Sequence, residues 1–213
     1  MTPGIIKKKV LRNLNDYSFS ITLRKIISYL IQPVYENRTY RIYRFDLENF
    51  QEIPSGESVF AFKIIDKSDT GIIRQIEDME EWLKGKVASR LEAVGLCLVA
   101  LDGERVAGFN LVSLGEGRIP LIGLRRDLRE NEVWSDQITV SKNYRGKGLG
   151  STLRYRIFKE LKKRGVRRIY GGTQISNLAS LNLARKVGFK EIADVQYLKI
   201  LNKKRLRFKR VRN

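Results

Sequence analysis

Residues 145–150 read RGKGLG, and this loop decides how the whole chain is interpreted. The stretch before it, Glu132–Val140, predicts a strand, and the apolar residues that recur after it at helical spacing predict a helix. A strand-to-helix turn directs several backbone N–H groups at one spot, and its glycines leave that spot open. Together with the helix dipole and the charges of Arg145 and Lys147, the loop predicts a binding site for a diphosphate.

The alternation of Gly146, Gly148 and Gly150 separates this loop from the two most familiar phosphate-binding motifs. A Walker A loop needs a Gly-Lys-Ser/Thr ending, and the dinucleotide-binding fingerprint needs Gly-x-Gly-x-x-Gly followed by an acidic residue further along the chain. Neither motif fits the loop. Because glycine-rich turns with solvated Arg and Lys side chains are common, the six residues alone leave a purely structural role open.

The region around the loop resembles the GNAT superfamily of acyl-CoA-dependent N-acetyltransferases. The donor loop of that family reads Gln/Arg-x-x-Gly-x-Gly/Ala, which Arg145, Gly148 and Gly150 match. The family also has a helix that opens with Asn and ends with Gly-Phe, and the stretch Asn177 to Phe189 matches it. The resemblance covers about residues 60–201 and implies transfer of an acyl group, most simply acetyl, to a primary amine.

The sequence predicts an α+β fold in which helices flank a mixed, mostly antiparallel sheet, and the resemblance implies the GNAT form of that fold. Asp102 and Gly103 lie between two apolar runs and predict a tight hairpin. The other predicted elements are strands at 60–64, 132–140 and 168–173, helices at 72–94 (with a break at Gly85), 149–161 and 177–186, and a final pair of strands at 190–193 and 196–201.

Three segments are predicted along the chain. Residues 1–56 form a basic extension with an amphipathic helix at 22–35 and a strand at 38–50, and this helix packs on the protein's own core or contacts a membrane or partner. Residues 57–202 form the acyltransferase domain. Residues 203–213 are interpreted as a basic tail, with a strand end that contacts an anion as the alternative.

The resemblance implies acetyl-CoA or another acyl-CoA as co-substrate and no metal. In the family, the strand before the loop separates from its neighbour, and its backbone pairs with the pantetheine arm like an added strand. Asn177 is expected to contact the pantetheine region and also to cap its helix. The implied donor-binding residues are Ile138, Thr139, Val140, Arg145, Gly146, Lys147, Gly148, Leu149, Gly150, Ser151, Asn177 and Ser180.

The family reaction is direct attack of an amine on the thioester, which calls for a base. Asp136 matches a position where some members place a catalytic carboxylate, and Glu132 is a second candidate. Alternation along the strand predicts that Glu132, Asp136 and Ile138 share one face. A structural carboxylate paired with Arg or Lys, and a water molecule as proton relay, stay open as alternatives.

The general acid is less well marked. Many family members use a Tyr in the helix that opens with Asn and ends with Gly-Phe. The matching residue in this chain is Ala184. Tyr197 and Ser180 are the remaining candidate donors, although a core role for Tyr197 and a capping role for Ser180 are simpler. A thiol is acidic enough to leave unassisted, so an acid need not exist.

The composition points to an anionic partner. The chain has 42 Lys and Arg against 23 Asp and Glu, a formal charge of +19, which suits RNA, a membrane surface or an acyl carrier protein as well as a plain solvated surface. The absence of His excludes histidine triads, and the single Cys97 excludes an internal disulfide. No apolar run is long enough to span a bilayer. A cytoplasmic protein, peripheral at a membrane if at all, is expected, and a homodimer stays open.

Two further functions compete with the acyl-CoA-dependent enzyme. One is a catalytically silent module that keeps the fold to bind CoA or an anionic partner. The other is an acyltransferase that takes its acyl group from acyl carrier protein, whose acidic face would suit the basic chain. A purely nucleic-acid-binding protein would explain the charge but neither motif.

Overall fold

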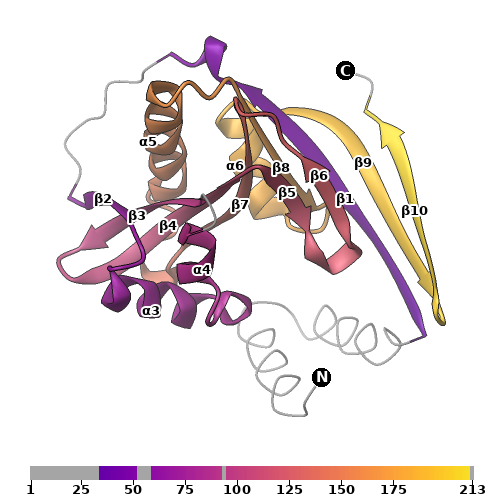
Figure 1. Cartoon of the computed structure of the whole chain (residues 1–213), viewed down its shortest axis with the longest axis horizontal. Coiled ribbons are helices and arrows are strands. Elements are labelled where there is room, and N and C mark those ends of the chain that lie inside the picture. The colour runs from indigo at the N-terminus through magenta and orange to yellow at the C-terminus, as the bar shows by residue number, and fades with distance from the viewer. Residues whose placement is uncertain (1–33, 52–58, 93–94, 212–213) are drawn as a thin grey trace. The chain divides into compact units, whose positions relative to one another are not determined.

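The computed structural model describes residues 34–51, 59–92 and 95–211 (Figure 1). Backbone contacts divide the chain into a larger unit, Arg41–Ala193 with Arg210–Asn213, and a smaller unit, Met1–Tyr40 with Asp194–Lys209. The amphipathic helix predicted at 22–35 lies almost entirely outside the described residues. The two units do not follow the boundaries predicted at 56/57 and 202/203, and that three-segment division stays a prediction.

The elements follow one another as β1 (Tyr35–Asp46), η1 (Leu47–Asn49), β2 (Ala61–Ile65), α3 (Thr70–Met79), η2 (Glu81–Leu83), α4 (Val87–Glu92), β3 (Gly95–Asp102), β4 (Arg105–Leu114), β5 (Glu116–Ile119), η3 (Pro120–Ile122), β6 (Leu124–Asp127), β7 (Glu132–Val140), η4 (Lys142–Tyr144), α5 (Leu149–Lys163), β8 (Arg168–Gln174), α6 (Leu178–Lys186), β9 (Lys190–Ile200) and β10 (Lys203–Arg210).

The sheet is mixed, as the α+β prediction requires. In the larger unit its strand order is β1-β8-β7-β4-β3-β2, and in the smaller unit it is β10-β9-β1. The pairs β2/β3, β3/β4 and β4/β7 are antiparallel, whereas β7 and β8 run parallel with α5 as their connection. A parallel pair needs such a crossover, and Gly165, the second residue after the crossover helix, has the positive φ typical of a helix C-terminus.

The two faces of the larger unit's sheet carry separate apolar clusters. On one face, α5 buries Leu153, Ile157 and Phe158 against the sheet, together with Phe189 from the chain after α6. On the other face, α3, α4 and η2 cover Phe109 and Leu111 of β4. Figure 1 shows α5 on one side of β3 and β4, with α3 and α4 on the other. Alternate residues of each strand therefore face different helices.

The C-terminal part of the chain corrects two predictions. The strands predicted at 190–193 and 196–201 are one continuous strand, β9. The predicted basic tail is an ordered edge strand, β10, because pairing with β9 satisfies its backbone even though six of its eight side chains are cationic. The helix predicted at 72–94, with a break at Gly85, is observed as α3 and α4 with η2 and Gly85 between them. In addition, the short hairpin of β5 and β6 had no counterpart in the prediction.

Candidate active site

The glycine-rich loop is anchored to the sheet at its start. The Tyr144 hydroxyl donates a hydrogen bond of 2.7 Å to Asp102 in the β3–β4 hairpin turn, and the Ser141 N–H donates to the carbonyl of Ala107 at 2.9 Å. The Arg145 Nε donates to the Val140 carbonyl at 3.0 Å. These contacts hold the loop at the C-terminal end of β7, where the sequence predicted it.

Two glycines give the loop its shape. Gly146 and Gly148 both have φ near +79°, a backbone conformation that residues with a Cβ rarely adopt. Gly148 is the residue directly before α5. The Ser151 and Thr152 N–H groups turn back to the Gly148 carbonyl, whereas the first N–H groups of a helix have no partner within it. The loop is exposed, and a Cβ at Gly146 or Gly148 would touch nothing. A diphosphate can therefore approach the N–H groups at the start of α5 that have no partner within the helix.

Gly150 has a different role. A Cβ at this position would lie 3.3 Å from the Leu183 side chain of α6, so the glycine allows the start of α5 to pack closely on α6. Asn177, which precedes α6, accepts a hydrogen bond of 3.2 Å from the Ser180 N–H through its side-chain oxygen. The predicted cap is confirmed. The cap uses only the side-chain oxygen of Asn177, so the side-chain NH2 group can still donate a hydrogen bond to a ligand.

The edge of β7 toward β8 is open over the second half of the strand. The parallel pairing runs from Glu132 opposite Arg168 to Ser135 opposite Gly171 and then stops, whereas β7 continues to Val140 on its other side with β4. Within the described sheet, residues 136–140 therefore have no strand partner on this edge. An extended ligand with amide groups can occupy such an edge as an added strand.

A β-bulge lies where the open edge begins. Leu111 of β4 is opposite Gln137, and the next residue, Val112, is opposite Ser135, so Asp136 is the extra residue of β7. The prediction that Glu132, Asp136 and Ile138 share one face is therefore wrong. The bulge reverses the alternation, and Ile138 packs in the apolar cluster under α5, where Val133 also lies.

Asp136 lies on the sheet face covered by α3 and α4. It accepts a hydrogen bond from the Ser113 hydroxyl, and its carboxylate is 3.7 Å from the Arg90 guanidinium. Burial raises the pKa of Asp136, and the bond from Ser113 and the charge of Arg90 offset only part of this effect. A buried carboxylate with a raised pKa is a better proton acceptor than an exposed one, so the site can supply a base.

Other polar groups lie on the same face of the sheet. Glu80, directly after α3, accepts a hydrogen bond of 3.0 Å from the Thr139 hydroxyl, which in turn accepts one of 2.9 Å from Gln137. The Arg90 guanidinium lies 5.0 Å above the ring of the exposed Trp82. These residues were not predicted from the sequence, because α3 and α4 approach β7 only in the folded chain.

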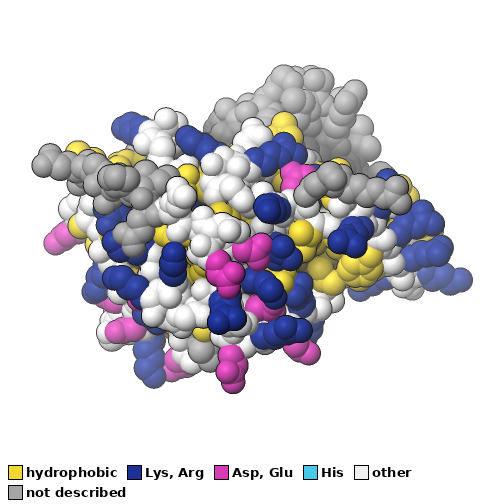
Figure 2. Space-filling model, turned by 90° about the horizontal axis from the view of Figure 1, so that it is seen from above, with side chains coloured by type: hydrophobic (Ala, Val, Ile, Leu, Met, Phe, Trp, Pro, Cys, Tyr) yellow, Lys and Arg dark blue, Asp and Glu magenta, His cyan; other side chains and the backbone are white. Residues whose placement is uncertain are grey.

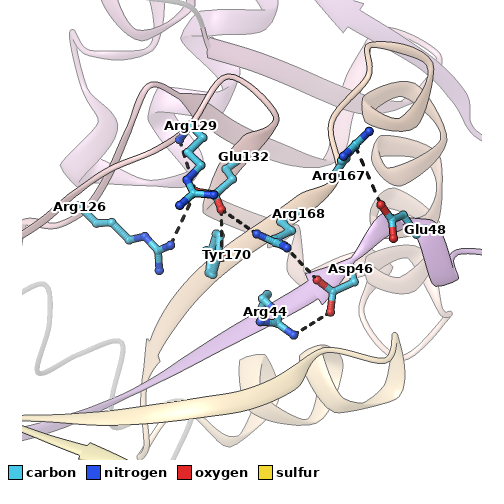
Figure 3. A network of polar contacts seen from close by, with 9 residues as sticks. All are labelled: Arg44, Asp46, Glu48, Arg126, Arg129, Glu132, Arg167, Arg168 and Tyr170. Atoms are coloured by element: carbon cyan, nitrogen blue, oxygen red, sulfur yellow. Dashed lines mark hydrogen bonds and ion pairs between the residues drawn. The ribbon is translucent and has the colours of Figure 1, made fainter.

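Glu132 lies at the other end of β7, in an ion-pair network (Figure 3). The buried carboxylate accepts hydrogen bonds from the Tyr170 hydroxyl at 3.2 Å and the Arg129 N–H at 3.4 Å, and it lies 3.7 Å from Arg126 and 3.5 Å from Arg168. Burial acts to raise the pKa of Glu132, but these hydrogen bonds and charges together lower it. A carboxylate this well satisfied suits a structural role.

The remaining predicted donors are Tyr197 and Ser180. Tyr197 is a buried residue of β9 in the smaller unit, where burial raises its pKa. Ser180 lies in the first turn of α6 and is half-buried. Ala184 is buried on the face of α6 that points to α5, and its methyl group cannot donate a proton.

Two buried residues near the end of the open edge were also missed. Arg154 of α5 donates hydrogen bonds to the Ser135 hydroxyl and, at 3.4 Å, to the Asn110 side chain, and no carboxylate pairs with it among the described residues. Tyr43 of β1 lies against Gly171, with its hydroxyl 3.1 Å from where a Cβ of Gly171 would be. In the sequence, Arg154 is marked only by its place directly after an apolar position of α5, which is a weak sign of a functional residue. Tyr43 was not considered because it precedes the region of the resemblance.

The comparisons with known proteins agree with this geometry. A family model described as the acetyltransferase (GNAT) family matches residues 59–189, more than half of the chain. In fold, the chain is similar to a GCN5-related N-acetyltransferase from Sphaerobacter thermophilus (16% identity, TM-score 0.57, 84% of this chain and 57% of that one), a GNAT-family protein from Novosphingobium aromaticivorans (13%, 0.54, 76% and 63%) and a GCN5-related N-acetyltransferase-like protein from Streptococcus suis (19%, 0.55, 84% and 68%). No curated protein matches the chain.

The fold and the glycine-rich loop define an acetyltransferase-type domain. The chain belongs to the GNAT acetyltransferase family, which confirms the resemblance seen in the sequence. It spans less than two thirds of the length of the first two of these similar structures. None of the described helices is long and apolar enough to cross a membrane, and within the described ranges no three acidic or Cys side chains are grouped as metal ligands would be.

Proposed function

We propose that this protein transfers an acyl group from an acyl-CoA to a primary amine by direct attack. The observation that carries the proposal is the continuity of the glycine-rich loop with the open edge of β7. The diphosphate of the donor binds the N–H groups at the start of α5, with Arg145 and Lys147 beside it. The pantetheine arm then runs back along residues 138–140, and Asn177 donates to it from the start of α6.

The open edge limits how far the donor extends. From Val140 back to Asp136 there are four residue steps, about 13 Å at the rise of a strand. Beyond Asp136, the edge is occupied by β8 through the pair Ser135 and Gly171. An arm that extends the sheet therefore ends beside this pair, and the thioester it carries lies next to the bulge at Asp136.

Asp136 acts as the base in this proposal. An amine that enters from the α3/α4 face reaches the thioester carbon beside the carboxylate, which takes its proton as the C–N bond forms. Glu80 and Arg90 lie on the same face and orient the acceptor. Glu132, held by four partners at the far end of the strand, takes no part.

Two other functions from the sequence analysis remain distinct outcomes of experiment. A silent CoA-binding module would bind the donor without turnover. An enzyme that depends on acyl carrier protein would turn over only with the acylated carrier, because the carrier's acidic surface would supply most of the affinity. The exposed cations of the loop suit the CoA diphosphate directly, which is why acyl-CoA is proposed first.

The excess of cations suggests that an anionic macromolecule or surface takes part, as acceptor or as anchor. Figure 2 shows Lys and Arg side chains spread over the visible face among fewer acidic ones. The strand β10 carries six cations in eight residues, and Figure 1 shows it at the edge of the smaller unit's strands. Binding to RNA, anionic vesicles and acyl carrier protein at low salt tests this proposal. Affinities no stronger than for a neutral control would contradict it.

Turnover with a panel of amines tests the proposed reaction. The assay follows release of free thiol from acetyl-CoA and from a longer acyl-CoA, with and without each amine. Amine-dependent thiol release that is lost in Asp136→Asn supports the proposal. Release that no amine accelerates, despite donor binding, would favour the silent module.

A further inference from the structure

The described residues near the end of the open β7 edge contain several buried polar groups without partners. The Nε of Arg154 and the Nδ2 of Asn110 are buried and make no hydrogen bond in this part of the chain. The Tyr43 side chain is buried close to them, against Gly171 of β8. Buried donors are normally satisfied, so such a group calls for an explanation.

Tyr43 reaches this place because Gly171 has no side chain. The Tyr43 ring lies across Gly171 of β8, and its hydroxyl is 3.1 Å from the position a Cβ would occupy. Its ring packs edge-on against Phe189, with centroids 5.0 Å apart, which fixes the ring plane. Gly171 is opposite Ser135, the last residue of β7 that pairs with β8. The Tyr43 hydroxyl therefore lies beside the pair at which an added strand must end.

The hydroxyl and Asp136 lie on opposite faces of the sheet. Ser135 points toward α5, since it accepts a hydrogen bond from Arg154, and Tyr43 packs in the same apolar cluster as Ala184 and Phe189. Asp136 instead contacts Ser113 and Arg90 on the α3/α4 face. A thioester between these faces would have a carboxylate on one side and a phenol on the other.

We propose that Tyr43 is the general acid of this enzyme, the group that protonates the leaving thiolate, and that Arg154 assists it. This inference rests on the proposed acyl transfer from a thioester. The family-model match begins at residue 59, so the proton donor comes from a strand outside the matched region. It takes the place of a donor that Ala184, with only a methyl group, cannot provide.

The proton transfers balance. The amine nitrogen bonds to the carbonyl carbon and loses a proton to Asp136, and the C–S bond breaks as the Tyr43 proton moves to sulfur. The products are an amide and a free thiol. One proton then passes from Asp136 to the Tyr43 phenolate through solvent, which restores both groups.

The electrostatic surroundings suit this role. Burial raises the pKa of Tyr43, which keeps the phenol protonated at neutral pH, while the charge of Arg154 acts in the opposite direction and stabilises a transient phenolate. Burial lowers the pKa of Arg154, but a guanidinium stays charged inside a protein. Its positive charge also favours a thiolate that forms beside it.

The variant Tyr43→Phe removes only the hydroxyl, and Tyr40→Phe is its matched control. Tyr40 lies on the same strand, and its side chain is buried as well. We expect Tyr43→Phe to lower kcat about 100-fold, the lower end of the range for acid–base catalysis, with unchanged donor Kd and Tm. The control should keep kcat within about twofold of the wild type, since its hydroxyl takes no part in the proton transfer.

A donor with a poorer leaving group separates a chemical role from a structural one. In the oxygen-ester analogue of the acyl-CoA, an alcohol replaces the thiol and depends more on protonation. The rate loss in Tyr43→Phe should therefore be larger with the ester than with the thioester. Equal losses with both donors, or a wild-type kcat, would overturn the role of Tyr43. Absence of turnover by the wild type itself would contradict the proposed function instead.

Discussion

Ser135 and Gly171 form the last pair between β7 and β8, and the two strands separate immediately beyond them. The bulge at Asp136 follows directly, and Arg154 holds Ser135 from the α5 face. The open edge thus ends at this backbone pair. The proposed base lies next to the pair on one face of the sheet, and the buried cation lies next to it on the other face. The position of the proposed chemistry depends on this pair and not on the glycine-rich loop alone.

Gly148→Asp should abolish stabilisation by the donor. The added carboxylate would face the diphosphate, and φ near +79° disfavours any residue with a Cβ, at about 1 kcal/mol of folding free energy. Gly165→Asp, at the other end of α5, has φ near +77° and similar open surroundings, so it carries the same backbone cost. Thermal unfolding with and without saturating acyl-CoA measures the difference. A shift in Tm that survives in Gly148→Asp would move the donor site elsewhere.

Asp136→Asn should lower kcat by about 10²- to 10⁴-fold, the usual contribution of a general base, and leave the donor Kd unchanged. The wild-type rate should rise with pH through a pKa above the usual Asp value, because burial raises the pKa of Asp136 and only the ionised form accepts a proton. The pH–rate profile of both proteins measures this limb. The role of Asp136 fails if the variant keeps the wild-type rate and limb.

Glu132→Gln should reduce stability more than activity. The variant leaves Arg126 and Arg168 without their buried partner, which we expect to cost about 2–3 kcal/mol at neutral pH. Because the folded pKa of Glu132 is lowered, this contribution is present above the unfolded pKa and is lost as pH falls through the folded pKa. Denaturant unfolding at neutral and acidic pH, with the exposed Glu130→Gln as control, measures the effect. A difference that grows on acidification would contradict it.

Cys97 should be inert in the folded protein. Its side chain is fully buried, and burial raises the pKa of its thiol to about 12, so almost no thiolate forms at pH 8. A colorimetric thiol reagent should label it only in denaturant. Stoichiometric labelling of the native protein within seconds would show that the β3 core opens readily.

The parts of the site that depend on neighbouring residues were predictable from the sequence. Gly146 and Gly148 predict a turn with positive φ, and Asn177 predicts a helix cap, since each feature depends on the chemistry of a few adjacent residues. The Asp102–Gly103 hairpin follows for the same reason.

Features that depend on distant pairing were not predictable. Ile138 was assigned to the face of Asp136 by strict alternation, which the bulge opposite Leu111 and Val112 breaks. Tyr43 reaches β8 only because β1, from the start of the described chain, inserts next to a strand far along the sequence. The many cations of residues 203–213 led to the prediction of a tail, whereas pairing with β9 stabilises β10 as a strand. In each case the missing information is which segments meet.

Calorimetric titration of the wild type with acetyl-CoA, a longer acyl-CoA and free CoA tests whether the glycine-rich loop and the open edge of β7 bind the donor. We expect micromolar binding, with an affinity of free CoA close to that of the acyl forms, because the loop and the open edge contact the parts that all three ligands share. Absence of binding by all three ligands would contradict an acyl-CoA site at residues 145–150.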